Sequence, residues 1–281
     1  MAARAFRILN VFARAGRLTG NPLCVFENGE GLDDAAMQAL ARQFNLSETT
    51  FILPSESANA RVRIFTPAYE MPFAGHPTLG TAHVVRSLLS AGDALTLEMQ
   101  AGIIPVTARG DRWTLAARPA RSRTARVSAA DIAAMLGLAP ADVLVPILWV
   151  NAGTEQLMVP LASRAAVERA RPVADRFLAL ESEDRPGKML TFADDGDSRG
   201  TALARFFFPA NGAILEDPAT GSACANLGGW FQATRPGKAI ARVIAQGESV
   251  GRPSTLHLSI AEERIQVGGD VIELGRGQLT L

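Results

Sequence analysis

The stretch RIFTPAYEMPFAGHPTLGTA, residues 63–82, decides the fold because a second copy of it occurs later in the chain. That copy is RFFFPANGAILEDPATGSACANLGG, residues 205–229. Arg-Ile-Phe-Thr-Pro-Ala at the start of the first copy matches Arg-Phe-Phe-Phe-Pro-Ala at the start of the second. After a loop that differs by four residues, Ala-Gly-His at 74–76 matches Thr-Gly-Ser at 220–222, and each copy runs into a helix of small residues. A repeat at about half the chain length predicts the same unit twice: strand, proline turn, glycine, polar residue, helix.

Each copy places a glycine, Gly75 or Gly221, at the expected start of its helix. A glycine lets a ligand approach the backbone closely. The unpaired N–H groups of a first helical turn, helped by the helix dipole, bind an anion such as a carboxylate. Two such helix starts facing each other across a domain interface would form a two-sided binding site. Either turn alone is equally typical of an ordinary capped connection, and it is the recurrence that favours binding.

Composition excludes several classes of partner. The chain has 281 residues, of which 48% are hydrophobic, enough for one large domain or two smaller ones. The formal net charge is zero and no basic patch stands out, so neither nucleic acid nor an anionic membrane is an expected partner. No run of 18 apolar residues predicts a membrane span. We expect a cytoplasmic protein.

Neither a metal nor a cofactor is expected. The chain has three histidines and two cysteines, Cys24 and Cys224, without the spacings of a zinc site. Two cysteines make no disulfide framework, which favours a reducing compartment. A Gly-x-Gly-x-x-Gly motif, a P-loop and a lysine suited to pyridoxal phosphate are all missing from the sequence, so the consistent chemistry is proton transfer without a cofactor.

Hydrophobic patterning predicts an α+β protein with mainly antiparallel sheets. Helices are expected where apolar residues recur every three to four positions, and strands where β-branched and aromatic residues cluster. Ser128 is expected to cap one short helix, with Asp131 three residues later, and Gly92 to end the helix that starts near Thr78. The expected helices are 32–46, 78–92, 128–138, 163–172 and 220–234, and strands fill most of the remainder.

Five motifs in this order and spacing resemble the phenazine-biosynthesis isomerase family (PhzF-like) of the diaminopimelate epimerase-like superfamily. They are GNPLCVF, NLSETTFIL, RIFTPAYEMPFAGHPTLGTA, EDPATGSA and QGESVGRPS, and the resemblance covers essentially the whole chain. It implies two pseudo-symmetric domains, each an antiparallel barrel-like sheet around a central helix, with the active site in the cleft between them. We expect the first domain at 1–117, completed by 270–281, and the second at 118–269.

The resemblance also implies which residue transfers the proton. The superfamily's racemases carry one cysteine before the glycine of each half, but here those positions are Ala74 and Thr220, so a thiol pair is not available. In PhzF-like enzymes the glutamate of the NLSET motif, here Glu48, is the general acid and base. A carboxylate at the mouth of an apolar strand can be partly desolvated, which raises its pKa toward the range useful for a general base. Without the resemblance, Ser47 and Glu48 could merely cap a turn.

The family's substrate-binding positions are also intact. His76, Asp217 and Ser222 match the residues that hold the substrate's amine, hydroxyl and carboxylate groups, and Gly75 and Gly221 supply backbone donors. Each has a simpler interpretation, because Asp-Pro starts turns in any protein and a histidine or serine at a helix start can serve the helix alone. Gln246-Gly247 and 251–254 are family hallmarks, interpreted as loop geometry.

The sequence therefore predicts an isomerase that needs no cofactor and moves a proton on a small carboxylate, of the trans-2,3-dihydro-3-hydroxyanthranilate isomerase type. Two alternatives stay open: an epimerase or racemase of a small amino or hydroxy acid that uses Glu48, with Asp217 as a candidate second residue, and a family member that binds a small molecule without turnover. A homodimer is suggested by family analogy alone.

Overall fold

A computed structural model describes residues 3–16, 18–184, 186–196, 200–210 and 212–281. The chain divides into two compact units, unit 1 with Met1–Ala116 and Gly268–Leu281 and unit 2 with Ala117–Val267. Strand β17 (Arg264–Thr280) begins in unit 2 and continues through unit 1. In the part of the chain that the structure describes, no helix is long and apolar enough to cross a membrane.

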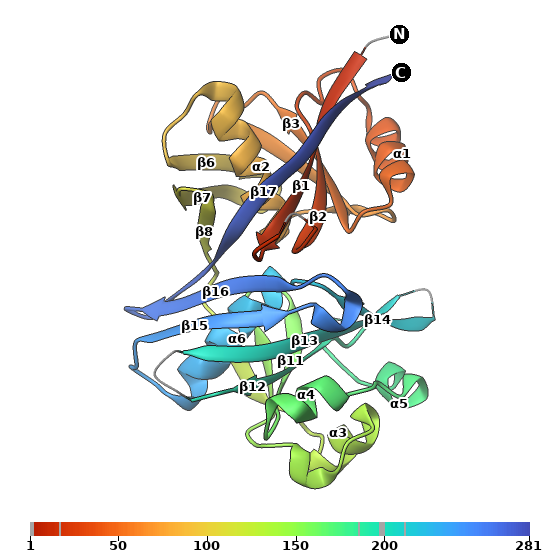
Figure 1. Ribbon diagram of the computed structural model, residues 1–281, viewed down its shortest axis with the longest axis vertical. Helices are drawn as coiled ribbons and strands as arrows, with labels where there is room; N and C mark the ends of the chain where they lie inside the picture. The colour runs from red at the N-terminus through yellow and green to blue at the C-terminus, as the bar shows by residue number, and fades with distance from the viewer. Residues whose placement is uncertain (1–2, 17, 185, 197–199, 211) are drawn as a thin grey trace. The chain divides into compact units, whose positions relative to one another are not determined.

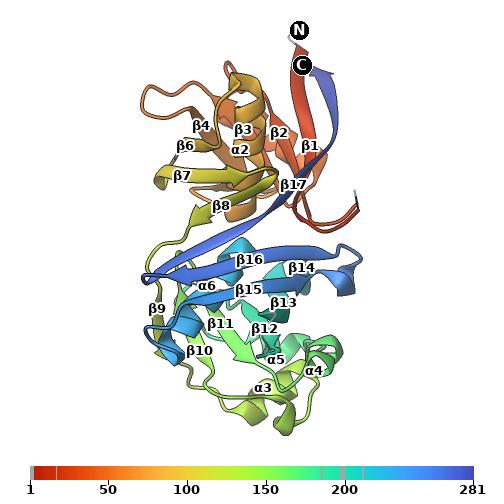
Figure 2. The same cartoon turned by 60° about the vertical axis from the view of Figure 1, so that its left-hand side comes forward.

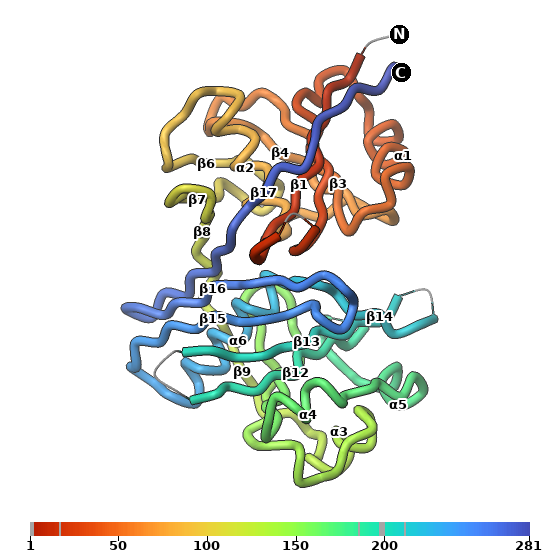
Figure 3. The backbone as a smooth tube through the Cα atoms, viewed as in Figure 1, coloured from red at the N-terminus to blue at the C-terminus, as the bar shows by residue number. Residues whose placement is uncertain are grey.

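Unit 1 is a barrel-like sheet closed by the C-terminal strand. Its elements are β1 (Ala3–Ala13), β2 (Asn21–Phe26), α1 (Asp34–Phe44), β3 (Glu48–Leu53), β4 (Ala60–Phe65), β5 (Glu70–Met71), α2 (Gly75–Leu89), β6 (Ala94–Met99), β7 (Gly102–Arg109) and β8 (Arg112–Ala116). Strand β17 pairs antiparallel with β1 along most of its length and also pairs with β8. The first and last strands of the chain consequently lie side by side, with Ala3 paired to Thr280 (Figure 3).

Unit 2 repeats this plan. Its elements are β9 (Arg121–Thr124), α3 (Ala129–Leu136), β10 (Leu148–Asn151), β11 (Glu155–Pro160), α4 (Arg164–Arg169), α5 (Ala174–Leu178), β12 (Met189–Asp194), β13 (Thr201–Ala210), β14 (Ala213–Asp217), α6 (Gly221–Thr234), β15 (Ile240–Gln246) and β16 (Ser254–Ala261), with short 3-10 turns at Pro140–Asp142 and Glu248–Val250. Unit 2 places α6 among its strands as unit 1 places α2 (Figures 1 and 2).

Strand pairing shows the repeat in detail. Most neighbours are antiparallel, but the described residues of both units also form parallel pairs: β2 with β3 and β4 with β6 in unit 1, β11 with β12 and β13 with β15 in unit 2. Parallel neighbours need a crossover, and α1 and α2 supply the crossovers in unit 1. The predicted α+β class is therefore confirmed, while the number of parallel pairs exceeds what the alternating pattern indicated.

The central helix of each unit is buried on all sides, which explains its small residues. Every residue of α2 from His76 to Ala82 is buried, as is every residue of α6 from Ala223 to Phe231. A methyl group added at Gly80 would lie 2.5 Å from Leu23, and one at Gly229 would lie 2.5 Å from Ala120. These glycines let the strands pack directly on the helix backbone.

The start and end of α2 differ from the prediction. The helix begins at Gly75, not near Thr78, because Pro77 falls in the first turn, where no backbone N–H is required. It ends at Leu89, and Ser90 rather than Gly92 adopts the left-handed cap at φ 49°. The earlier start places Gly75 and His76 inside the first helical turn.

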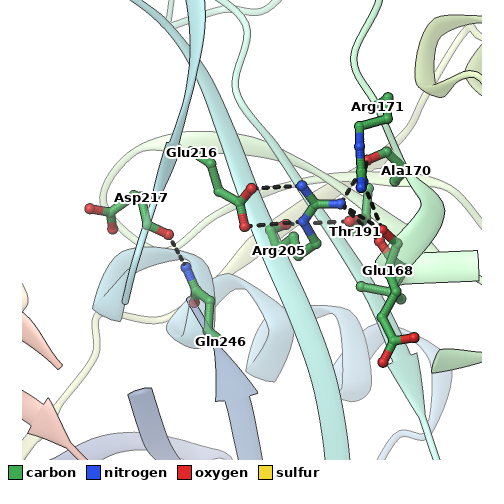
Figure 4. Close-up of polar contacts among 9 residues, drawn as sticks. Glu168, Ala170, Arg171, Thr191, Arg205, Glu216, Asp217 and Gln246 are labelled. Carbon is green, nitrogen blue, oxygen red and sulfur yellow. Dashed lines mark hydrogen bonds and ion pairs between the residues drawn. The ribbon is translucent and has the colours of Figure 1, made fainter. Parts of the chain in front are cut away.

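The repeat extends to an arginine–glutamate ion pair in each unit, half-buried in unit 1 and buried in unit 2. Arg63 makes two hydrogen bonds to Glu70, both 2.7 Å, and Arg205 makes two to Glu216 at 3.1 and 2.7 Å (Figure 4). Both arginines also stack on the phenylalanine two residues later in their strand. The arginine that opens each copy therefore links the two strands of the hairpin that precedes the central helix, β4–β5 in unit 1 and β13–β14 in unit 2.

We expect Glu216→Gln to destabilise the protein more than Glu70→Gln does. The side chains of the Arg205–Glu216 pair are only 7% and 9% exposed, against 16% and 20% for Arg63–Glu70. Removing one charge of the more buried pair leaves the other uncompensated, at a cost of about 3 kcal/mol, whereas the more exposed pair should cost about 1 kcal/mol. Denaturant unfolding of both variants measures the difference, and equal losses would contradict this ranking.

Candidate functional site

Unit 1 brings Glu48, Gly75 and His76 together. Glu48 is the first residue of β3, and His76 is the second residue of α2. The His76 Nε2 and Glu48 Oε2 atoms lie 3.2 Å apart. Both side chains are largely buried, with 7% and 15% of their surfaces exposed. The Glu48 carboxyl group and the His76 imidazole thus meet where the start of β3 lies beside the start of α2.

Burial determines the protonation state of His76. Loss of hydration lowers the pKa of His76 to about 3, and a hydrogen bond to the backbone of Pro22 offsets only part of this effect. A proline has no N–H, so the Pro22 backbone can only accept, and the imidazole must donate. His76 Nε2 has no hydrogen-bond partner among the described residues. The donor is therefore Nδ1, and the neutral ring directs a lone pair from Nε2.

This tautomer has a consequence for Glu48. A lone pair on His76 Nε2 and a carboxylate oxygen 3.2 Å away are both acceptors, so a proton is needed for an attractive contact. A proton on Glu48 Oε2 would supply it. The arrangement is thus suited to a carboxyl group that gains and loses a proton while the neighbouring imidazole stays neutral.

The start of α2 offers backbone donors beside this pair. Its N-cap, Ala74, provides no side-chain hydrogen bond, and the first helical bond runs from Thr78 N to the Ala74 carbonyl at 3.2 Å. The N–H groups of Gly75 and His76 precede that bond. Helix α6 starts in the same way, since Cys224 N bonds the Thr220 carbonyl at 3.0 Å. Both starts can bind an anion.

Unit 2 brings Asp217, Gly221 and Ser222 to one turn. Asp217 ends β14, and its carboxylate accepts a hydrogen bond from the Thr220 hydroxyl. The Asp217 carboxylate points away from the Arg205–Glu216 pair (Figure 4). The Asp217 carboxylate is therefore separate from the ion pair that the preceding residue, Glu216, makes with Arg205.

Ser222 is held by a buried amide network. Gln156 Nε2 donates to the Ser222 hydroxyl at 3.0 Å, and Asn226 Nδ2 donates to the Gln156 carbonyl oxygen at 2.9 Å. Asn226 also accepts from the Ala152 N–H. Both amide side chains are only 1% exposed. Because the Ser222 oxygen already accepts a bond, its own proton is directed elsewhere and can be donated to a ligand.

The candidate site residues of unit 1 and unit 2 lie at matching positions of the repeat, but their side chains differ in type. Strand registers align the β3–β4 and β12–β13 pairs so that Glu48 corresponds to Lys188. Burial lowers the pKa of this lysine. At the helix starts His76 corresponds to Ser222, and Met71 corresponds to Asp217. The acid of unit 1 has no acidic counterpart at the matching place in unit 2.

Sequence reasoning missed the amide side chains Gln156 and Asn226 as site residues and assigned Gln246 to loop geometry. All three are buried polar residues, but their partners lie 26 or more positions away, so only the pairing of strands shows the contacts.

Burial raises the pKa of both Cys24 and Cys224, so neither thiol is a reactive base. Within the described residues, no cluster of His, Cys, Asp and Glu could hold a metal ion.

Comparisons with known proteins agree with this architecture. A family model described as phenazine biosynthesis-like protein matches residues 9–276. An uncharacterised isomerase of Pasteurella multocida is 37% identical, over 98% of this chain and 93% of the relative. The trans-2,3-dihydro-3-hydroxyanthranilate isomerase of Pseudomonas fluorescens is 34% identical, over 98% of each chain. A PhzF-family crystal structure from Bacillus anthracis superposes with a TM-score of 0.89, at 23% identity and over 100% of both chains, which shows a common fold.

Proposed function

The chain belongs to the phenazine biosynthesis-like family, and we propose that it is an isomerase that moves a proton between two carbons of a small carboxylate substrate. The resemblance in the NLSET and GHP motifs and the names of the curated relatives support this reaction class. The observation that carries the assignment of residues is the 3.2 Å approach of Glu48 Oε2 to the neutral imidazole of His76.

In the proposed reaction Glu48 is both base and acid. Its carboxylate removes a proton from one carbon, the C–H electron pair enters the conjugated system, and the double bond shifts. Glu48 then delivers a proton to a different carbon, so the substrate is neither oxidised nor reduced. His76 Nε2 faces the protonated Glu48 Oε2 and holds the proton between the two half-reactions.

The polar groups of the two helix starts would bind the substrate. We assign its carboxylate to the backbone N–H groups beginning at Gly75 and Gly221, where the helix dipole favours negative charge. Ser222 donates a hydrogen bond, and Asp217 accepts one from an amine or hydroxyl.

Proton NMR in D₂O with trans-2,3-dihydro-3-hydroxyanthranilate tests the proposal. Turnover should shift the double bond and introduce deuterium at the carbon that receives the proton, since a carboxyl proton exchanges with solvent. Deuterium entry with inversion at the original carbon and no shift of the double bond would instead favour the epimerase alternative. Binding without exchange would favour the non-catalytic one.

A further inference from the structure

We propose that Gln246 is a positioning residue that fixes Asp217 and Thr220 for the reaction. This inference rests on the proposed function, in which Asp217 binds a polar group of the substrate. Gln246 is the last residue of β15 and is 2% exposed. Its side chain reaches the turn between β14 and α6, which carries both residues, and Figure 4 shows its contact with Asp217.

The amide of Gln246 makes three contacts with this turn. Its Nε2 donates to the Asp217 backbone carbonyl at 2.8 Å and to the Thr220 hydroxyl oxygen at 3.1 Å. Its Oε1 accepts from the Thr220 backbone N–H at 3.3 Å. One buried side chain therefore uses both its donor and its acceptor to fix the two ends of the turn.

These contacts determine where the Thr220 proton points. The Thr220 oxygen accepts from Gln246, and its hydroxyl donates to Asp217 Oδ2. A hydroxyl that lacked the Gln246 donor could rotate and accept from another group. Gln246 thus acts on the Asp217 carboxylate through Thr220, which sets the orientation of the carboxylate toward a substrate.

The backbone after Gln246 is shaped for this close approach. Gly247 has φ +83°, and a Cβ at this position would lie 2.4 Å from the Pro218 carbonyl oxygen and 2.3 Å from that of Arg252. Only glycine fits both the conformation and the contact. The Gln-Gly pair therefore brings β15 directly against the turn that holds Asp217.

Unit 1 provides an internal comparison. Met99 is the last residue of β6, and the parallel registers with β4 and β13 place it at the position of Gln246. The matching turn has Met71 in place of Asp217 and Ala74 in place of Thr220. The fold therefore builds this turn equally well from three apolar residues. The polar set in unit 2 has a purpose other than folding.

The residues of unit 1 define the test variants. Gln246→Met, Thr220→Ala and the double variant carry the side chains that the other copy uses, and Gln246→Glu keeps the shape but loses the donor. Gln232→Met, on the last turns of α6, is the matched control. We expect kcat to fall about 10- to 100-fold in each single variant and in Gln246→Glu, and the double variant to match Gln246→Met.

The pattern of the double-variant cycle separates positioning from general structural damage. Residues that act in series lose no further activity when combined, whereas independent effects multiply. Multiplying losses, or an unchanged kcat in either Gln246 variant, would overturn the proposal.

Crystal structures of the wild type and Gln246→Met provide a readout that needs no substrate. We expect Thr220 to lose its contact with Asp217 Oδ2 and the carboxylate to turn. An unchanged Asp217 and Thr220 would overturn the inference even if the enzyme is active. A wild type that fails to isomerise the substrate would contradict the proposed function, and the crystal structures would still decide whether Gln246 positions the turn.

Discussion

Glu48→Gln should lower the isomerisation rate about 10⁴-fold, because it removes the carboxylate that we propose to carry the proton. The amide cannot accept a proton from carbon, yet it has the same shape as the carboxyl group. Its N–H₂ can also donate to His76 Nε2, which lies 3.2 Å from Glu48 Oε2. Substrate binding should therefore be retained while turnover and deuterium incorporation are lost.

Single-turnover NMR in D₂O, with substrate affinity measured separately, checks both parts of this prediction. Glu56→Gln, an exposed glutamate of the same unit, is the matched control and should retain full activity. If Glu48→Gln still introduces deuterium at the wild-type rate, another residue is the base. If it loses binding as well, Glu48 holds the substrate and does not only transfer a proton.

The sequence predicted the features that depend on local signals and on the repeat. Ser128 caps its helix with Asp131 as expected, because both halves of a capping box lie within four residues. The two copies at 63–82 and 205–229 do form equivalent turns and central helices. The class of fold followed from the hydrophobic patterning, and the family from the five motifs that stand in the same order and spacing.

The features that sequence could not predict depend on strand register. The parallel pairs arise from crossovers through helices, which an alternating pattern does not show. Similarly, the approach of Glu48 to His76 and the network from Ser222 to Asn226 join residues distant in sequence. One available signal was the repeat itself: a polar Gln246 stands where the other copy has Met99, at a buried strand end.

The contrast between the copies argues that the duplicated fold has specialised. Both units keep the helix start and the arginine–glutamate pair, which serve folding. Unit 1 alone has the acid beside a neutral imidazole, and unit 2 alone has the Asp217–Thr220–Gln246 set. This asymmetry suits the proposed reaction, in which one residue both removes and returns a proton.

His76 should make the protein less stable as the pH falls from about 6.5 toward 3. Its pKa in the folded protein is about 3, below the value of 6.5 for a free histidine. Above pH 6.5 the ring is neutral in both the folded and the unfolded state, so its protonation does not change the free energy of unfolding. Between the two pKa values only the unfolded chain binds the proton, and unfolding becomes more favourable with each step down in pH.

The expected loss is about 3 kcal/mol at pH 4 relative to pH 7, since each pKa unit corresponds to about 1.4 kcal/mol. His76→Asn removes the titrating ring but keeps a donor that can reach the Pro22 carbonyl, so its stability should fall less steeply over this window. Denaturant unfolding at a series of pH values compares it with the wild type, and His257→Asn controls for loss of a histidine elsewhere. Parallel curves for His76→Asn and the wild type would show that the ring is charged in the folded protein, and Glu48 would then face an imidazolium rather than a neutral acceptor.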